Sequence, residues 1–394
     1  AWNIAQEPFM KPHKTVSTLK LRLSAGMTGQ QDGIGDYVHL ARYNITSNPS
    51  YLYNMGNSDY VYPVTPLAYD PTIRWETTIT YNIGIDYGFF NDRLSGSIDA
   101  YLADTKDLLN SVQVPMGSNF GNKLTTNVGS LRNRGLEFSI SAIPVQKPGL
   151  SVQVGFNGTF QNTVFTKLNP TEDKGYYIEV GNISKGTGGY LSRQMTGYSP
   201  YTYYLYQQKY DSTGHPIQNE FVDRDGDGTI TGNDRYMTGK SVSPGFFYGM
   251  NLKVTFRNWD FGMNGHGAAD TWVFNDFASA NSTASLDLNA GSLPNQALVV
   301  KRTGFTAPNS ARQWYSDYFV ENASFFRLDD VNLGYTFRGI GRWETDIRLA
   351  LGVQNVFVIT GYSGGDPEVI SENGIDGTTW PRSRTYSLRL NVNF

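Results

Sequence analysis

The sequence has 394 residues, a net charge of −3 and no cysteine, and 17% of its residues are charged, against about 25% in typical soluble domains. With no excess of positive charge to meet phosphates, the chain is excluded as a basic nucleic-acid-binding protein. The absence of cysteine excludes disulfide scaffolds, thiol catalysis and cysteine-ligated zinc or iron–sulfur centres.

The remaining composition favours an all-β protein. Aromatic residues number 55 (26 Tyr, 22 Phe and 7 Trp), and glycine accounts for a further 42. The mean hydropathy is −0.40 and no window of about 18 predominantly apolar residues exists, so no transmembrane helix is predicted. A transmembrane β-barrel remains compatible with these values, because its lipid-facing residues alternate with polar ones.

Alternation of apolar and polar residues with a period of two predicts ten strands. Each of them has one apolar and one hydrated face, as expected of a half-buried strand. In chain order they are predicted at 19–27, 79–89, 94–102, 136–142, 150–160, 248–256, 259–266, 326–337, 347–353 and 386–394. The alternation changes phase at Asp329 and Asp330, which predicts a β-bulge in the eighth strand.

Short and long connections alternate strictly along the chain. The short ones are predicted at 91–92, 144–149, 257–258 and 338–344, and the long ones at 29–75, 108–132, 166–243, 267–323 and 358–383. Because two-residue connections join antiparallel neighbours, this order puts all long connections at one end of the sheet. Transmembrane barrels share this asymmetry, with short periplasmic turns and long extracellular loops. A strand-like run at 201–206 is placed inside loop 166–243, since a lone spanning strand would reverse every later connection.

These features predict a transmembrane antiparallel β-barrel. The predicted strands exceed the average length of about 5–6 residues and can cross a bilayer core, which needs about 9–11 tilted residues. Their inward residues are mostly polar, which suits a hydrated lumen or a polar plug, so we expect an arc of a larger barrel. Aromatic residues near strand ends suit interfacial girdles: Trp75, Tyr87, Phe89, Phe90, Trp259, Phe337, Trp343 and Phe394. A soluble β-sandwich is the alternative fold.

One motif carries metal chemistry. The segment 223–234 matches a twelve-residue calcium loop, with carboxylates at positions 1, 3, 5 and 12 and an apolar residue at position 8. Gly228 at position 6 permits the sharp turn that aims alternate side chains at one cation. The predicted ligands of Ca²⁺ (or Mg²⁺) are Asp223, Asp225, Asp227, the carbonyl of Thr229, and Asp234 in place of the usual glutamate. We expect the ion to rigidify an extracellular loop, with an Asp/Gly-rich surface turn as the alternative.

Other chemistry is sparse, and no enzymatic activity is expected. The four histidines are scattered, and the adjacent Asp329 and Asp330 point to opposite faces of a strand, which is poor geometry for glycoside hydrolysis. Aromatic residues in loop 267–323 are candidates for contact with substrate, although packing within the loop is the favoured interpretation. They are Trp272, Phe274 and Phe277.

Several blocks resemble the SusC/RagA family of TonB-dependent outer-membrane transporters. They include Trp-Glu-Thr-Thr at 75–78 and Gly-Asp-Pro-Glu at 365–368. The others lie at 84–96, 104–109, 127–138, 223–235, 326–328, 332–335, 354–357 and 381–386. The blocks occur in the family's order over essentially the whole chain, which makes the resemblance specific.

The resemblance implies that residues 1–394 are the C-terminal arc of a 22-stranded barrel in the outer membrane of a Bacteroidota-type Gram-negative bacterium. It also implies TonB-dependent import of oligosaccharides or peptides, delivered by a SusD-like surface lipoprotein that forms a hinged lid. The chain starts at Ala1, so we expect it to be mature or truncated. Its other expected partners are the N-terminal barrel strands, the plug that contacts TonB, and membrane lipid. Phe394 resembles the terminal signal read by the barrel-assembly machinery.

Two further functions stay open at this point. One is a barrel without transport activity that anchors an adhesin or a binding lid at the cell surface. The other is a soluble, calcium-stabilised carbohydrate-binding β-module. The residues do not distinguish a glycan substrate from a peptide.

Overall fold

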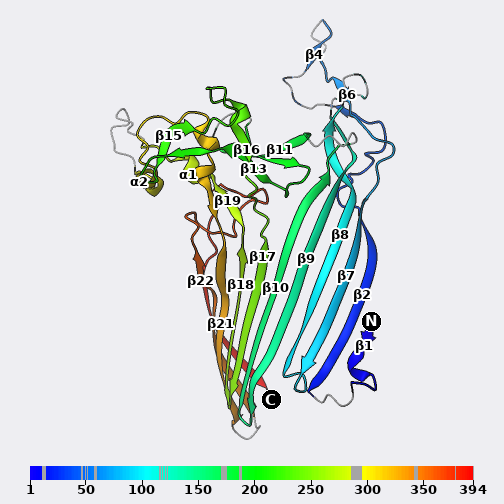
Figure 1. The fold of residues 1–394 in the computed structure, drawn as a ribbon, viewed down its shortest axis with the longest axis vertical. Helices are drawn as coiled ribbons and strands as arrows, with labels where there is room; N and C mark the ends of the chain where they lie inside the picture. The colour runs from blue at the N-terminus through cyan, green and yellow to red at the C-terminus, as the bar shows by residue number, and fades with distance from the viewer. Residues whose placement is uncertain are drawn as a thin grey trace.

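Ten long antiparallel strands form one continuous curved sheet (Figure 1). The computed structural model describes residues 1–10, 15–45, 48, 50, 52–56, 60–114, 117, 119, 121, 123–169, 175–185, 189–284, 295–340, 345–377 and 379–393. The long strands are β2 (Val16–Gln30), β7 (Glu76–Phe89), β8 (Leu94–Gln113), β9 (Lys123–Lys147), β10 (Leu150–Lys167), β17 (Phe246–Phe256), β18 (Trp259–Ala269), β21 (Phe325–Ile340), β22 (Thr345–Thr360) and β24 (Thr385–Asn393). A two-residue strand, β1 (Trp2–Asn3), pairs with β2.

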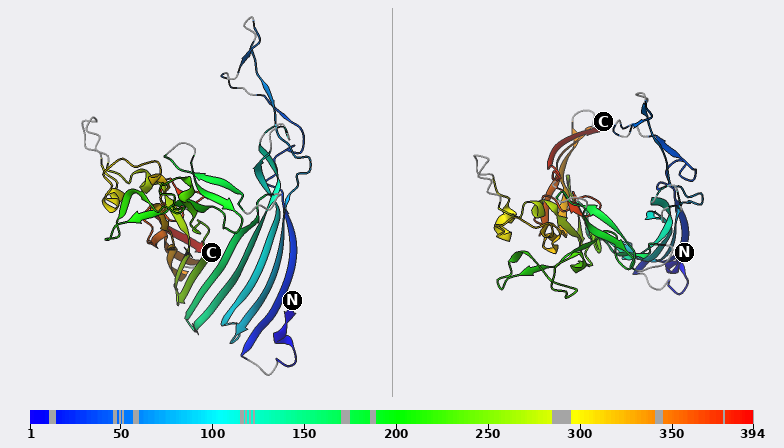
Figure 2. Two further views of the ribbon diagram at one scale, coloured as in Figure 1. Left: turned by 45° about the horizontal axis from the view of Figure 1, so that its top comes forward. Right: turned by 90° about the horizontal axis from the view of Figure 1, so that it is seen from above.

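The sheet confirms all ten predicted strands and the prediction of a barrel arc. Its order is β1-β2-β7-β8-β9-β10-β17-β18-β21-β22-β24, so each long strand pairs with its neighbours in sequence. Seen from above, the strands follow an arc whose two edge strands, β1 and β24, do not meet (Figure 2). None of the helices in the described part of the chain is long and apolar enough to span a membrane.

The two faces of the sheet differ as the alternation predicts. One face of the wall exposes apolar side chains on every long strand, for example Leu23, Ile83, Ile98, Leu136, Val154, Met250, Trp259, Leu333, Leu351 and Leu388. An apolar surface of this extent is not stable against water, and it marks a surface that contacts lipid or protein. The opposite face carries ion pairs, which are described with the candidate site.

The predicted bulge at Asp329 is confirmed. In the β18–β21 pairing, Asn264 lies opposite Asp330, whereas the next residue, Gly265, lies opposite Leu328. The β21–β22 register shifts at the same place. The extra residue restores the apolar residues of β21 to the outer face on both sides of the bulge.

Tight turns lie at one end of the sheet and long connections at the other (Figure 1). The two-residue turn at 257–258 is confirmed, and β9 and β10 are joined by 148–149. The predicted two-residue turn at 91–92 was wrong, because four residues, 90–93, form it. Three of these, Phe90, Asn91 and Asp92, have positive φ angles of 57°, 57° and 58°. The remaining predicted turn is 338–344. Its residues 341–344, which include Trp343, lie outside the described residues.

One predicted long loop is mostly strand. Strands β8 and β9 continue to Gln113 and Lys123, well into the range 108–132. Asp107 has a φ of 59°, and the β8–β9 register shifts on both sides of Leu108. These irregularities break the alternation of apolar and polar residues, so the pattern ends before the strands do. The other long connections span 31–75, 168–245, 270–324 and 361–384.

The long connections fold into small sheets above the wall. A four-stranded sheet contains β11 (Tyr177–Asn182), β12 (Tyr190–Met195), β13 (Thr202–Tyr206) and β16 (Arg235–Met237), and a second sheet contains β20 (Val320–Asn322), β19 (Trp272–Asn275) and β23 (Ile375–Asp376). The other elements are hairpin β14 (Gln208–Tyr210) with β15 (Pro216–Phe221), helices α1 (Asp276–Ala280) and α2 (Leu298–Thr303), and 3₁₀ turns η1 (Ile4–Gln6), η3 (Gly232–Asp234), η5 (Gln313–Tyr315) and η6 (Asp317–Phe319). Strand β13 confirms that the run 201–206 belongs to the loop and not to the wall.

Connection 31–75 projects away from these sheets as a separate arm (Figure 2). It contains two short hairpins, in which β3 (Tyr43–Ile45) pairs with β6 (Val64–Pro66) and β4 (Tyr53–Asn54) with β5 (Tyr60–Val61). The described residues of these four strands are almost all exposed.

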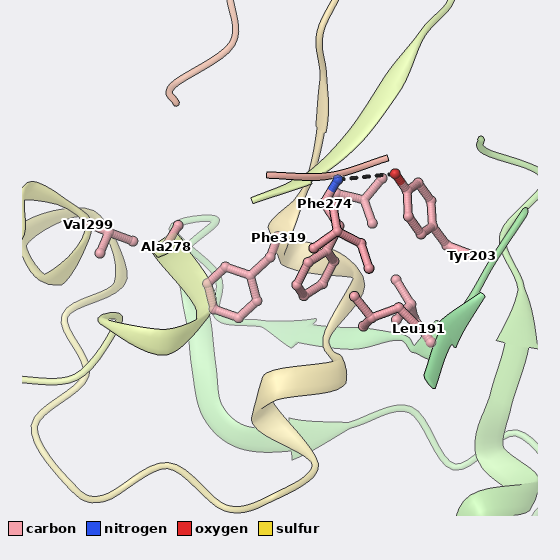
Figure 3. Close-up of a cluster of buried hydrophobic side chains, with 9 residues drawn as sticks. Leu191, Tyr203, Phe274, Ala278, Val299 and Phe319 are labelled. Atoms are coloured by element: carbon pink, nitrogen blue, oxygen red, sulfur yellow. Dashed lines mark hydrogen bonds between the residues drawn. The ribbon is translucent and has the colours of Figure 1, made fainter. Parts of the chain in front are cut away.

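A compact core holds the loop sheets together (Figure 3). Its buried members include Leu191, Tyr203, Leu205, Phe274, Ala278, Val299 and Phe319. The Tyr203 hydroxyl donates to the carbonyl of Gly374 (2.7 Å) and accepts from the backbone N–H of Phe274 (3.2 Å). Burial raises the pKa of the Tyr203 phenol, so the ring stays neutral and bonds three segments that are far apart in sequence.

Candidate functional site

The inner face of the wall carries charged side chains in pairs. Arg22 of β2 donates to Asp86 (2.8 Å) and to Asp99 (2.9 Å) on the next two strands. Gly84 makes room for this triad, because a Cβ there would lie 2.1 Å from the Asp99 carboxylate. Arg348 of β22 pairs with Asp260 of β18 (2.5 Å) across the intervening strand. Paired charges of this kind suit the hydrated lumen of a barrel.

A buried arginine fixes the last long connection to the wall. Arg327 of β21 is 1% exposed, and its guanidinium donates to Asp366 (2.6 Å) and to Glu368, both in connection 361–384. The same guanidinium donates to Asn355 of β22 (2.5 Å). These contacts give the N–H donors of the guanidinium charged and polar acceptors inside the protein, as a buried charge requires.

Glu368 extends the network to a neighbouring strand. His266 of β18 lies between two carboxylates, with its Nε2 2.8 Å from Glu368 and its Nδ1 2.6 Å from Asp329. Arg382 lies 3.4 Å from Glu368. No joint role is predicted for these residues from the sequence. The only signal was that the blocks at 326–328 and 365–368 both belong to the family resemblance.

The predicted metal loop brings three of its carboxylates together. Oxygen atoms of Asp223, Asp225 and Asp227 lie within 4.8 Å of one another. Within the described residues, this is the one group of acidic or histidine side chains close enough to share an ion. Backbone N–H groups at 226 and 228 donate to Asp223 (2.7 and 2.9 Å), and that of Thr229 donates to Asp227 (2.7 Å). The loop is therefore pre-shaped by its own turns.

Asp234, the fourth predicted carboxylate ligand, is not a member of this group and is buried. It has no exposed surface, and its carboxylate accepts the backbone N–H groups of Arg224 and Thr231, both at 2.7 Å. The backbone N–H groups of Thr231 and Arg224 lower the pKa of Asp234. The N–H of Asp227 favours ionised Asp225, but desolvation and the neighbouring carboxylates outweigh it and raise the pKa of Asp225. Carboxylates held this close repel one another unless a cation lies between them.

The candidate substrate aromatics are not brought together on one surface. Phe274 has no exposed surface and packs against Tyr203 and Phe319 in the core (Figure 3). Trp272 is half-buried, and the Lys240 ammonium lies 4.0 Å from its ring centroid. Phe277 is exposed on α1. For Phe274 the structure supports the packing interpretation. Phe394 lies outside the described residues.

The comparisons with known proteins match this geometry. The family model described as "TonB dependent receptor-like, beta-barrel" matches residues 18–356. The chain belongs to the TonB-dependent receptor β-barrel family. This assignment places the sheet in the outer membrane and excludes the soluble β-sandwich that the sequence left open.

This TonB-dependent receptor chain has relatives among curated proteins and solved structures. It is 38% identical to the TonB-dependent receptor SusC of Bacteroides thetaiotaomicron, with 100% of the chain and 39% of SusC covered. It is 28% identical to the TonB-dependent receptor P3 of Formosa agariphila, with 100% of the chain and 41% of P3 covered. The structure of the RagAB peptide transporter has the same fold, with a TM-score of 0.79 and 22% identity. The match covers 100% of this chain and 42% of the transporter chain. The predicted SusC/RagA resemblance is confirmed. The chain spans about two fifths of the length of these curated relatives.

Proposed function

We propose that this chain is part of the wall of an outer-membrane importer that takes up oligosaccharides or peptides with energy delivered through TonB. The observation that carries the proposal is the two-faced wall, which is apolar outside and lined with charge pairs inside. Such a wall encloses a polar path across an apolar membrane. The receptors named above, which match over the full length of the chain, support the same function.

A SusD-like surface lipoprotein is the proposed partner at the loop end of the barrel. The arm formed by connection 31–75 supports this proposal, because it projects beyond the other loops (Figure 2). It also exposes large apolar side chains. They include Tyr43, Ile45, Tyr53, Met55 and Tyr60. Clustered exposed aromatic and aliphatic side chains are typical of protein–protein contact sites.

Deletion of the gene tests the importer function. We expect cells that lack it to lose uptake of one class of labelled substrate, either oligosaccharides or peptides, and to regain uptake when the gene is restored. Cells without TonB should show the same loss. Unchanged uptake of both classes, together with reduced adherence, would contradict import and support the surface-anchor alternative.

We also propose that the loop 223–234 binds Ca²⁺. Support comes from the spacing of its carboxylates, their mutual distances and the prearranged turns. Asp223, Asp225 and Asp227 would supply side-chain oxygens, and Thr229 its carbonyl. Asp234 would supply a carboxylate oxygen from the inner side of the loop.

Replacing two ligands at once tests the calcium site. Calcium added after chelation should raise the melting temperature of the unmodified protein by several degrees, because an ion bound only by the folded state stabilises it. The variant with Asp223→Asn and Asp227→Asn should show no such rise. Asp211→Asn is the control, because Asp211 shapes a neighbouring turn through Thr213 and His215 and should keep the calcium response. An equal rise in the double variant would refute the site.

A further inference from the structure

Five side chains of the extracellular loops form a stack of alternating rings and guanidinium groups. The Arg193 Cζ lies 3.6 Å from the ring centroid of Tyr177 and 3.5 Å from that of Tyr204. The Arg235 Cζ lies 4.5 Å from the ring centroid of Tyr204 and 5.1 Å from that of Tyr315. Cation–π contacts therefore run from β11 through β12, β13 and β16 to η5.

The stack is fixed by hydrogen bonds at each guanidinium. Arg193 donates to Glu179 on β11 (3.2 Å). Arg235 donates to the carbonyls of Tyr204 (3.0 Å) and Tyr190 (2.5 Å). Desolvation by burial lowers the pKa of Arg235, which reflects how far this part of the stack is removed from water. These contacts leave the terminal ring, Tyr177, little freedom to rotate.

Tyr177 is the open end of the stack. Arg193 covers one face of its ring, yet the residue remains 43% exposed and lines a cavity of about 560 Å³. The cavity lies between β11 and the ends of β8 and β9. Its polar lining comes from Ser111, Lys123 and Glu179, and the rest comes from Gly175, Ile178 and two further tyrosines, Tyr176 and Tyr190. Its size falls within the range of small-ligand sites.

We propose that this cavity is a sugar-binding subsite, in which the apolar C–H face of a pyranose ring packs on the open face of Tyr177. Sugar hydroxyls would then bond to Glu179, Lys123 and Ser111 at the rim. A ring that is already immobilised loses little conformational entropy on binding, so the stack prepares the platform. The subsite deepens the proposed importer function, on which it rests, and assigns oligosaccharide as the substrate class.

An extended peptide is the competing occupant of the same place. Strand β11 is the edge of its sheet, and an edge can accept another strand. Gly181 weakens this option, because its φ of 78° takes β11 out of the extended conformation at the fifth of its six residues. The cavity combines tyrosine rings with polar side chains, which suit the apolar face and the hydroxyl groups of a sugar, so the observations favour a sugar.

Binding to the purified full-length protein tests the subsite. The probes are neutral hexasaccharides of an α-glucan, a β-glucan and a xylan, with penta-alanine for comparison, measured by titration calorimetry. We expect Tyr177→Ala to weaken binding of a saccharide by about tenfold or more, since a stacked ring contributes roughly that much. Tyr177→Phe should retain the affinity. Tyr210→Ala removes a tyrosine of similar exposure, 50%, in the same extracellular region and should change nothing.

Three outcomes overturn the proposal: no saccharide binds the unmodified protein, Tyr177→Ala binds as tightly as the unmodified protein, or only penta-alanine depends on Tyr177. Folding of each variant is checked by its melting temperature. If uptake requires the protein but Tyr177→Ala alters neither binding nor uptake, the subsite fails and the importer function stands. If saccharides bind through Tyr177 while uptake survives gene deletion, the subsite stands and the importer function fails.

Discussion

Replacing Arg327 with methionine should destabilise the protein by about 3–5 kcal/mol, the usual cost of removing one partner from a buried ion pair. The side chain is almost completely buried, and its removal leaves Asp366 and Glu368 charged without their main partner. Methionine keeps the apolar stem, so the loss reports the guanidinium and not packing volume. The free energy of unfolding in denaturant measures the effect.

Arg382→Met is the matched control for this experiment. Arg382 contacts the same carboxylate of Glu368, but at 3.4 Å and with a side chain that is 49% exposed. Exposed pairs of this kind contribute about 0–1 kcal/mol. In Arg327→Met, backbone amide hydrogen exchange should increase first in residues 361–377, because the network joins this segment to β21. Equal costs for the two variants would contradict the assignment of Arg327 as the anchor of the connection.

A charge on the outer face of the wall should be nearly as damaging. Ile83 lies on the apolar face of β7, half-way along the strand and 50% exposed. Ile83→Arg should cost about 2–4 kcal/mol of stability in a bilayer, the cost of a cationic side chain near the midplane on the lipid face of a barrel. The loss is measured by electrophoresis of the protein taken from membranes with and without denaturant, because a folded barrel that has not been heated migrates differently from the unfolded chain.

Asn82→Arg is the control on the same strand. Asn82 precedes Ile83 and points to the opposite face, because successive residues of a strand alternate. An arginine there faces the inner side of the wall, where Arg22 and Arg348 are already accommodated, and should cost less than about 1 kcal/mol. If Asn82→Arg were as damaging as Ile83→Arg, the assignment of one face to lipid and the other to the polar interior would be contradicted.

The wall was predictable because its folding signal is local. Every long strand has one apolar face, so a period of two identifies it, and the phase change at Asp329 locates a bulge without any tertiary information. The same signal failed where local geometry departs from the regular strand. Examples are Asp107, with its positive φ, and the four-residue turn after β7.

The candidate sites also differ in whether local sequence predicts them. The metal loop is twelve consecutive residues, so its spacing alone brings together Asp223, Asp225 and Asp227. The Arg327 network joins residues 39 and 41 positions apart, and no period or motif relates them. The stack behind Tyr177 depends on four strands of a loop sheet whose pairing the alternation does not encode. Sites built from distant segments therefore required the structure.

The curved sheet separates lipid from a polar interior. These 394 residues contain no cysteine. After replacement of any cysteine elsewhere in the full-length protein, single cysteines are placed at each position from 79 to 87, and the protein is spin-labelled in a bilayer. Collision rates are then measured with oxygen, which concentrates in lipid, and with a nickel chelate, which stays in water. We predict a period of two, with odd positions such as Ile83 and Ile85 exposed to oxygen and even positions such as Asn82 exposed to nickel. Uniform accessibility along the strand, or the opposite phase, would contradict the account.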